Sequence, residues 1–359
     1  MTRTTRLTRR GYLAAVGGAS AALAGCTGFT GSGDPSGTLT VATYPSWVEG
    51  EGPAGPWLKE EFEATYPDAT VEYVTPESTV NNYIRRKSEG APIDADLYVG
   101  LNVDQLLRVD AELDDPLFLD VQGEVKNGGN VKDGLRFDPD GRAVPYDTGY
   151  ISLVFDESAV DRPATFTDLT ADAWSDSLIV QNAQSSATGR AFLLWTIQQL
   201  GADGYLDYWR SLKENGITVL GDWDEAYNAY SEEEKPMVVS YSTDQVYANR
   251  YDQDMTRHQV AFLDDQGYAN PEGMALFADS DNRELATAFM DFMLSPAAQG
   301  EIAVRNVQFP AIPESEAELP ETFAQYAKAP TEPVTFTYEG LKGNVDGWTE
   351  DWAREIAQG

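Results

Sequence analysis

The N-terminal half of the chain alternates short apolar runs with amphipathic segments. Runs rich in β-branched residues predict strands, and the segments between them place apolar side chains at helical spacing. The predicted strands are residues 38–44, 70–76 and 95–101, and the predicted helices are residues 55–67 and 79–90. This order predicts a doubly wound α/β lobe, in which ligands bind beyond the carboxyl ends of the strands. Tyr44 and Asn102 stand at two of these ends.

The same pattern resumes after residues 144–156, a long extended stretch, and predicts a second lobe. Apolar strands followed by polar loops and helices are predicted within residues 177–201, 217–227 and 236–247. Residues 268–277 form a second extended stretch that returns to the first lobe. Two doubly wound α/β lobes joined by two extended crossovers indicate a hinged clamp with its ligand in the cleft between the lobes. The predicted division assigns residues 38–146 and 274–359 to lobe I and residues 147–273 to lobe II.

The chain of 359 residues is strongly acidic, with 25 basic and 59 acidic side chains and a formal net charge of −34. This charge repels nucleic acid, so we expect no nucleic-acid partner. The acids are spread along the chain, which is typical of proteins that work in concentrated salt, where screening weakens repulsion. Cys26 and His258 are the only residues of their types, so we expect neither a disulfide, a metal site nor a bound cofactor.

The first 26 residues have the features of an export signal. Paired arginines at positions 9–10 precede an apolar run at 13–25, which is too short for a spanning helix. This arrangement matches a twin-arginine signal. The "LAGC" sequence at 23–26 resembles a lipobox, in which Cys26 becomes the lipidated first residue of the mature chain. Residues 27–37 predict a flexible tether, so we expect an exported body anchored by lipid to the outer face of the membrane.

Six blocks make the chain resemble the thiamine-binding proteins of ABC importers, which have the type II periplasmic-binding-protein fold. These blocks are "LTVATYPSW", "ADLYVGL", "VPYDTGYISLVFD", "SSATGRAFLLW", "WDEAY" and "VVSYSTDQVY". The resemblance covers roughly residues 38–355, and the "WDEAY" and "SYSTDQVY" pair is its most specific part. It implies a monomeric receptor, not an enzyme, that captures thiamine or a thiamine phosphate and delivers it to an ABC permease in the membrane.

The resemblance also implies which residues form the ligand pocket. They are Tyr44 in lobe I and, in lobe II, Ser185, Ser186, Gly189, Trp223, Tyr227, Tyr241 and Tyr247. The chain departs from the family at Glu51, where a pocket Trp is expected, and at Val307, which follows Asn306 where an Asn-Trp pair is expected. Trp47 or Phe309 could fill the space, or the ligand could be a related pyrimidine compound.

Residue type suggests the remaining roles in such a pocket. Thiamine joins an aminopyrimidine to a cationic thiazolium, and a cation over a Tyr or Trp ring gains roughly 0.5–2 kcal/mol. Asn102, Asp147 or Ser242 could bond the aminopyrimidine, and Asp147 or Asp224 could balance the positive charge. The "SSATG" sequence could hold a phosphate at a helix N-terminus with the help of Arg190, or it could be an ordinary N-cap.

Taken singly, an aromatic residue usually packs in the core. We assign Tyr230 to the core from its position three residues after Tyr227, and Tyr150 and Trp195 because each lies within an apolar strand or helix. Polyamines, an oxyanion or ferric iron remain alternative ligands. Iron capture on this fold favours adjacent tyrosines with a His or carboxylate, whereas His258 has no partner visible in the sequence. A secreted carboxylate-based hydrolase is the alternative of a different class. The chain contains no nucleophile elbow and no phosphate loop.

Overall fold

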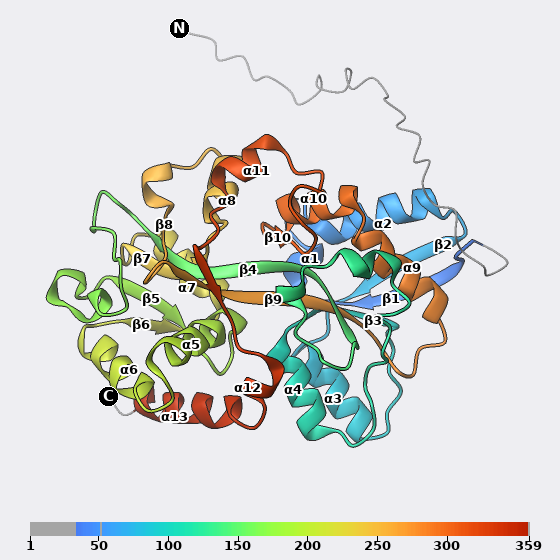
Figure 1. The fold of residues 1–359 in the computed structure, drawn as a ribbon, viewed down its shortest axis with the longest axis horizontal. Helices are drawn as coiled ribbons and strands as arrows, with labels where there is room; N and C mark the ends of the chain where they lie inside the picture. The colour runs from blue at the N-terminus through green and yellow to red at the C-terminus, as the bar shows by residue number, and fades with distance from the viewer. Residues whose placement is uncertain (1–33, 51, 358–359) are drawn as a thin grey trace, which may run out of the picture. The chain divides into compact units, whose positions relative to one another are not determined.

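The computed structural model of the protein describes residues 34–50 and 52–357 (Figure 1). The predicted export signal, Cys26, most of the predicted tether and Glu51 lie outside the described residues, so the interpretations that depend on them remain predictions. Among the helices of the described part, none has the length and apolar character needed to cross a membrane.

One mixed sheet of eleven strands runs through the described residues, and its main path is β2-β1-β3-β9-β4-β7-β5-β6. The strands are β1 (Gly37–Ala42), β2 (Ala69–Val74), β3 (Leu97–Leu101), β4 (Ala143–Phe155), β5 (Leu178–Gln181), β6 (Thr218–Leu220), β7 (Met237–Tyr241), β8 (Gln259–Ala261), β9 (Gln266–Leu276), β10 (Phe309–Pro310) and β11 (Glu332–Val334). Off the main path, β8 and β10 pair with β4, and β11 pairs with β9. The parallel pairs at the two ends, β1 with β2 and β3 and β5 with β6 and β7, correspond to the two predicted α/β patterns.

The two longest strands connect the ends of the sheet. β4 has 13 residues and β9 has 11, and they run antiparallel to each other through its centre. β4 then continues beside β7, whereas β9 continues beside β3. Nearly every β4 residue is buried, which explains why apolar and polar residues do not alternate along its sequence. Its polar residues Asp147, Thr148 and Ser152 are buried as well. These strands are the two predicted crossovers, so the predicted fold class is confirmed; the lobe boundaries stay a prediction.

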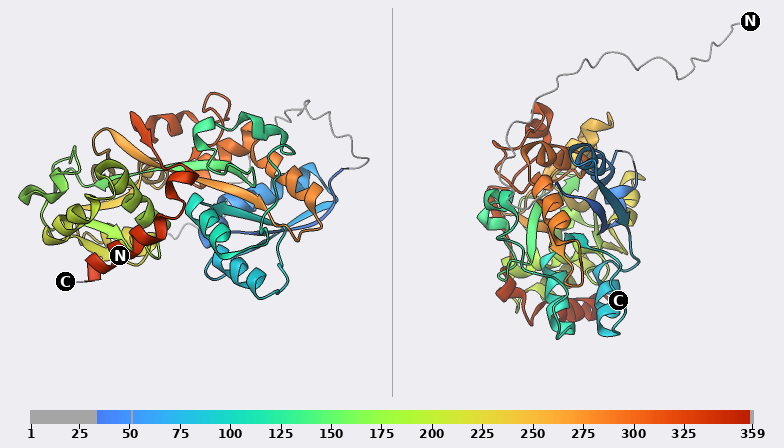
Figure 2. Two further views of the ribbon diagram at one scale, coloured as in Figure 1. Left: turned by 60° about the horizontal axis from the view of Figure 1, so that its bottom comes forward. Right: turned by 90° about the vertical axis from the view of Figure 1, so that its right-hand side faces the viewer.

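Helices cover both faces of the sheet. They are α1 (Pro45–Val48), α2 (Ala54–Thr65), α3 (Val80–Ser88), α4 (Val103–Glu112), α5 (Ala187–Leu200), α6 (Tyr205–Glu214), α7 (Trp223–Ser231), α8 (Asp244–Arg250), α9 (Arg283–Met293), α10 (Pro296–Arg305), α11 (Glu321–Tyr326), α12 (Tyr338–Leu341) and α13 (Val345–Ala357). At the β1–β3 end, α2 and α9 lie on one face and α3 and α4 on the other, as both figures show (Figures 1 and 2). No helix was predicted from the sequence at α1, α4, α6, α11 or α12.

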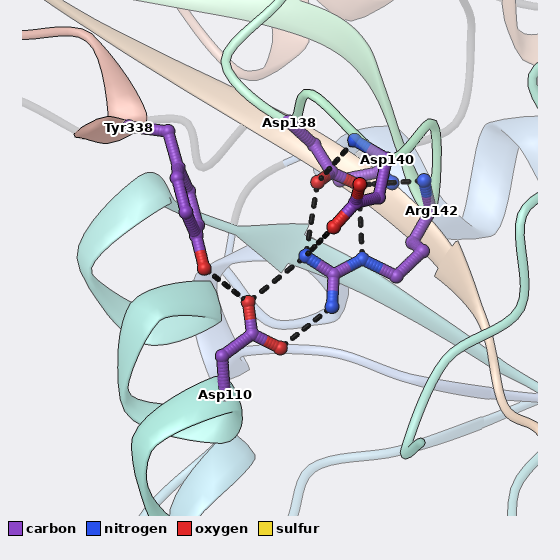
Figure 3. A network of polar contacts seen from close by, with 6 residues as sticks. Asp110, Asp138, Asp140, Arg142 and Tyr338 are labelled. Atoms are coloured by element: carbon purple, nitrogen blue, oxygen red, sulfur yellow. Dashed lines mark hydrogen bonds and ion pairs between the residues drawn. The ribbon is translucent and has the colours of Figure 1, made fainter. Parts of the chain in front are cut away.

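A polar network ties α4 and α12 to the start of β4 (Figure 3). The Arg142 guanidinium donates to both carboxylate oxygens of Asp110, at 2.6 and 2.9 Å, and to Asp138 Oδ1 at 3.0 Å. Tyr338 of α12 donates its hydroxyl to Asp110 Oδ2. Beyond α12, the chain continues into α13, where Trp352 packs edge-on against Trp209 of α6 with ring centroids 5.4 Å apart. The C-terminal segment therefore contacts α4 through α12 and α6 through α13.

Candidate binding cavity

A cavity of about 500 Å³ lies beyond the carboxyl ends of β1 and β3 and is closed on its other side by α5, α7, β7 and α8. Its volume falls within the range of small-ligand pockets, roughly 300–1,000 Å³. The predicted site residues that line it are Tyr44, Asn102, Ser185, Trp223, Tyr227, Tyr241 and Tyr247, and Asp224 also lines it. The fold thus brings together side chains that lie far apart in the sequence.

The other predicted site residues lie outside the cavity wall. Asp147 and Ser242 are fully buried. Ser186 is the N-cap of α5, and its hydroxyl accepts a hydrogen bond from the Gly189 amide at 3.3 Å. A Cβ at position 189 would lie 2.5 Å from the Gln181 carbonyl oxygen, so glycine there allows α5 to approach β5. The capping and packing of α5 therefore explain why Ser and Gly stand at positions 186 and 189, without a ligand contact.

The aromatic wall begins on α7. Trp223 and Tyr227 are four residues apart and so share one face of the helix, where their rings stack with centroids 4.8 Å apart and planes 23° apart. Tyr247 of α8 meets Tyr227 edge-on at 6.3 Å. Trp223 Nε1 donates to Ser240 Oγ at 3.0 Å, which fixes the orientation of the indole. The wall therefore presents fixed ring faces and edges to the cavity.

A buried acid that also lines the cavity, Asp244, holds Tyr227 in place. The Tyr227 hydroxyl donates to Asp244 Oδ1 at 2.5 Å, and Asp244 Oδ2 lies 2.6 Å from His258 Nδ1. Burial and the Asp244 carboxylate raise the pKa of Tyr227 well above its usual value, so the phenol stays neutral. The expectation that His258 lacks a partner is wrong, because α8 brings Asp244 against it.

The opposite side of the cavity carries a carboxylate that the sequence analysis missed. Glu272 of β9 lines the cavity and accepts hydrogen bonds from the hydroxyls of Tyr44, at 3.0 Å, and Tyr146, at 2.5 Å. Burial raises the pKa of the Glu272 carboxyl. The sequence did contain a signal for this site. Glu272 is the only charged residue in the extended stretch 268–277, and a charge inside a buried strand requires a partner or a function.

An ion pair joins the two sides of the cavity. Arg190 of α5 pairs with Asp104 of α4, and only 11% of each side chain is exposed. The same guanidinium donates to the carbonyl oxygens of Ala183 and Gln184. Arg190 therefore has carboxylate and carbonyl partners in this structure, which leaves less of its charge for a phosphate than the sequence suggested.

Neither residue suggested as an aromatic replacement reaches the cavity wall. Trp47 is buried and packs edge-on against Tyr146 at 5.2 Å, and Phe309 packs against Tyr150 at 5.1 Å. Val307 does line the cavity. The proposed replacement by Trp47 or Phe309 is therefore wrong.

Two of the three aromatic residues that were assigned to the core are buried. Trp195 and Tyr230 are buried, as predicted, whereas Tyr150 is half-buried. Within residues 34–50 and 52–357, no group of three or more His, Cys, Asp or Glu side chains is arranged to hold a metal ion.

Comparison with known proteins identifies the class. Residues 122–331 match the family model of bacterial extracellular solute-binding proteins. The chain is 30% identical over 321 residues to the thiamine-binding periplasmic protein of Escherichia coli (strain K12), covering 89% of this chain and 94% of that protein. It is 31% identical over 317 residues to the thiamine-binding periplasmic protein of Brucella suis biovar 1 (strain 1330), covering 88% and 91%. The chain therefore belongs to the bacterial extracellular solute-binding protein family.

Solved structures agree with this fold. A periplasmic thiamin binding protein superposes with a TM-score of 0.77 at 27% sequence identity, covering 90% of this chain and 99% of that chain. The ferric binding protein from Campylobacter jejuni gives a TM-score of 0.71 at 17% identity and covers 88% and 99%. The second likeness extends to the fold alone, because this fold serves several ligands.

Proposed function

We propose that this protein is the extracellular binding component of an ABC importer, and that it captures thiamine or a thiamine phosphate in the cavity for delivery to a membrane permease. The observation that carries the proposal is the stacked pair of Trp223 and Tyr227 in a cavity that also contains the Glu272 carboxylate. The thiamine-binding names of its relatives support the same ligand.

The cavity suits both rings of thiamine. Flat heterocycles stack on aromatic side chains, and the edges of Tyr and Trp rings offer hydroxyl and indole donors. The thiazolium carries a permanent positive charge, which gains energy over a ring face and next to a carboxylate. Tyr247 and Trp223 would supply the ring faces, and Glu272 the negative charge.

Export and anchoring complete the proposal. The twin-arginine pattern and the lipobox at Cys26 would place the body outside the membrane on a short tether, close to its permease. The excess of acidic over basic residues would keep it soluble as a monomer in concentrated salt. Since both named relatives are binding proteins, we propose a binding role without catalysis.

A calorimetric titration in molar salt tests the ligand. The chain without residues 1–26 is titrated with thiamine, thiamine monophosphate, thiamine diphosphate, spermidine and ferric citrate. Saturable heat with at least one thiamine compound, and none with ferric citrate, is expected. Binding of spermidine alone would replace thiamine with a polyamine, which aromatic rings and carboxylates also suit. Turnover of a glycoside by the purified protein would overturn the binding role.

A further inference from the structure

Two carboxylates lie side by side at the centre of the sheet. Asp147 of β4 and Glu272 of β9 are direct partners in the antiparallel ladder, so their side chains project from the same face. Glu272 lines the cavity, and Asp147 lies fully buried behind the wall. Asn306 connects them to the cavity, because it lines the wall and donates its amide to Asp147 Oδ2 at 2.7 Å.

The groups around this pair are nearly all neutral. The hydroxyls of Tyr44 and Tyr146 reach Glu272, and Asn306 reaches Asp147. Burial, and to a lesser extent the charges of Glu272 and Asp147, raises the pKa of Tyr241 of β7, the next strand. Arg305 also lines the cavity, but it pairs with Glu301 at 2.6 Å. Among the described residues, no basic side chain forms an ion pair with Asp147 or Glu272, and Asp147 Oδ1 has no hydrogen-bond partner.

Two ionised carboxylates in this position would be costly. Like charges directly opposite each other on neighbouring strands are destabilising, and so is a buried charge without a counter-ion. Burial, and for Asp147 also the charge of Glu272, raises the pKa of each carboxyl. A proton on one of the two groups would relieve this repulsion, as it does in paired carboxylates of other sites.

We propose that Asp147 and Glu272 form the cation subsite of the cavity, and that the empty protein holds a proton on this pair, which it releases when a permanently cationic ligand binds. In this exchange, the protonated protein and the cationic ligand give the complex and one free proton, and the proton passes to the buffer. The positive charge of the ligand replaces the positive charge of the proton. This inference rests on the proposed function for the identity of the ligand, thiamine.

Proton release makes the affinity depend on pH. Because one proton leaves as one thiamine binds, the association constant rises with pH by at most about tenfold per unit, until the pair is ionised in the empty protein. A neutral ligand, or a site whose carboxylates are already ionised, gives no such slope.

Calorimetry tests the proton directly. Thiamine is titrated into the protein at one pH in two buffers with different ionisation enthalpies, and the difference in observed heat gives the number of protons released. The wild type should release close to one proton, and the double variant Asp147→Asn/Glu272→Gln should release none and bind more weakly. Glu112→Gln is the matched control, because it makes the same substitution at an exposed carboxylate of α4 that does not line the cavity, and it should retain the release. Equal heats in both buffers, with saturable binding, would overturn this inference and leave the proposed function standing.

A second readout needs no ligand. Since the folded-state pKa of Glu272 lies above its unfolded value, the empty wild type loses stability as pH rises from the usual carboxylate range through the raised one. Glu272→Gln removes this loss, so its unfolding midpoint should fall less over that interval. If the unfolding midpoints of the wild type and Glu272→Gln change with pH in parallel, the shared proton is contradicted, whether or not thiamine binds. If thiamine does not bind but the midpoints differ as expected, only the proposed function is contradicted.

Discussion

Replacing Trp223 with alanine should weaken ligand binding more than it weakens the fold. The indole is half-buried on the first turn of α7, stacks on Tyr227 and lines the cavity. Its removal takes away one ring face of the wall and leaves the buried hydrogen bond from Tyr227 to Asp244 in place.

The loss can be estimated from the contacts of one ring. A cation over an aromatic face contributes about 0.5–2 kcal/mol. An aromatic stacking contact adds about 0.5–1.5 kcal/mol. A thiamine molecule that uses both contacts would lose about 1–3.5 kcal/mol, which raises the dissociation constant by roughly 5- to 400-fold.

Trp348→Ala is the matched control. Trp348 is also a half-buried tryptophan near the start of a helix, α13, but it packs against Phe336 and does not line the cavity. Both variants and the wild type are titrated calorimetrically with thiamine, after thermal unfolding has shown that each is folded. If Trp223→Ala and Trp348→Ala bind thiamine with equal affinity, the assignment of Trp223 to the ligand wall is refuted.

Four further substitutions test contacts that support the fold and the cavity. Gly189→Ala should lower the unfolding temperature markedly, since its Cβ would lie 2.5 Å from a β5 carbonyl oxygen; unchanged stability would contradict the close approach of α5. Asp104→Asn and Arg190→Gln should each weaken thiamine binding, more at low than at high salt, because they break an ion pair across the cavity; additive effects in the double variant would show that the pair contributes nothing. Arg142→Gln should destabilise the protein by about 3 kcal/mol in chemical denaturation, because it removes the counter-ion of a fully buried carboxylate; a change below about 1 kcal/mol would refute that role.

Local sequence patterns predicted much of the fold, because the spacing of apolar residues within a segment distinguishes a strand from a helix. The extended stretches predicted at 144–156 and 268–277 correspond to β4 and β9, and the spacing of Trp223 and Tyr227 placed both rings on one face of α7. The missed helix α4 also had a local signal. Asn102 and Gln105 form a capping box at its start, although Asn102 was interpreted only as the end of a strand.

The parts of the cavity that could not be predicted depend on contacts between distant segments. Strand register places Glu272 opposite Asp147, and no pattern within either segment specifies that register. The pairing of Arg190 with Asp104 likewise depends on how α5 and α4 meet across the cavity. Trp47 was suggested as a pocket residue by its type, but packing against Tyr146 directs it into the core. Residue type thus indicated the ligand chemistry, whereas tertiary packing decides which side chains reach it.

A crystal structure of the protein grown with saturating thiamine tests the central claim most directly. The account predicts one thiamine in the cavity, with its rings against Trp223 and Tyr247 and its thiazolium facing Glu272. A cavity that stays free of thiamine, or that retains a different ligand carried through purification, would contradict the claim that this receptor captures thiamine.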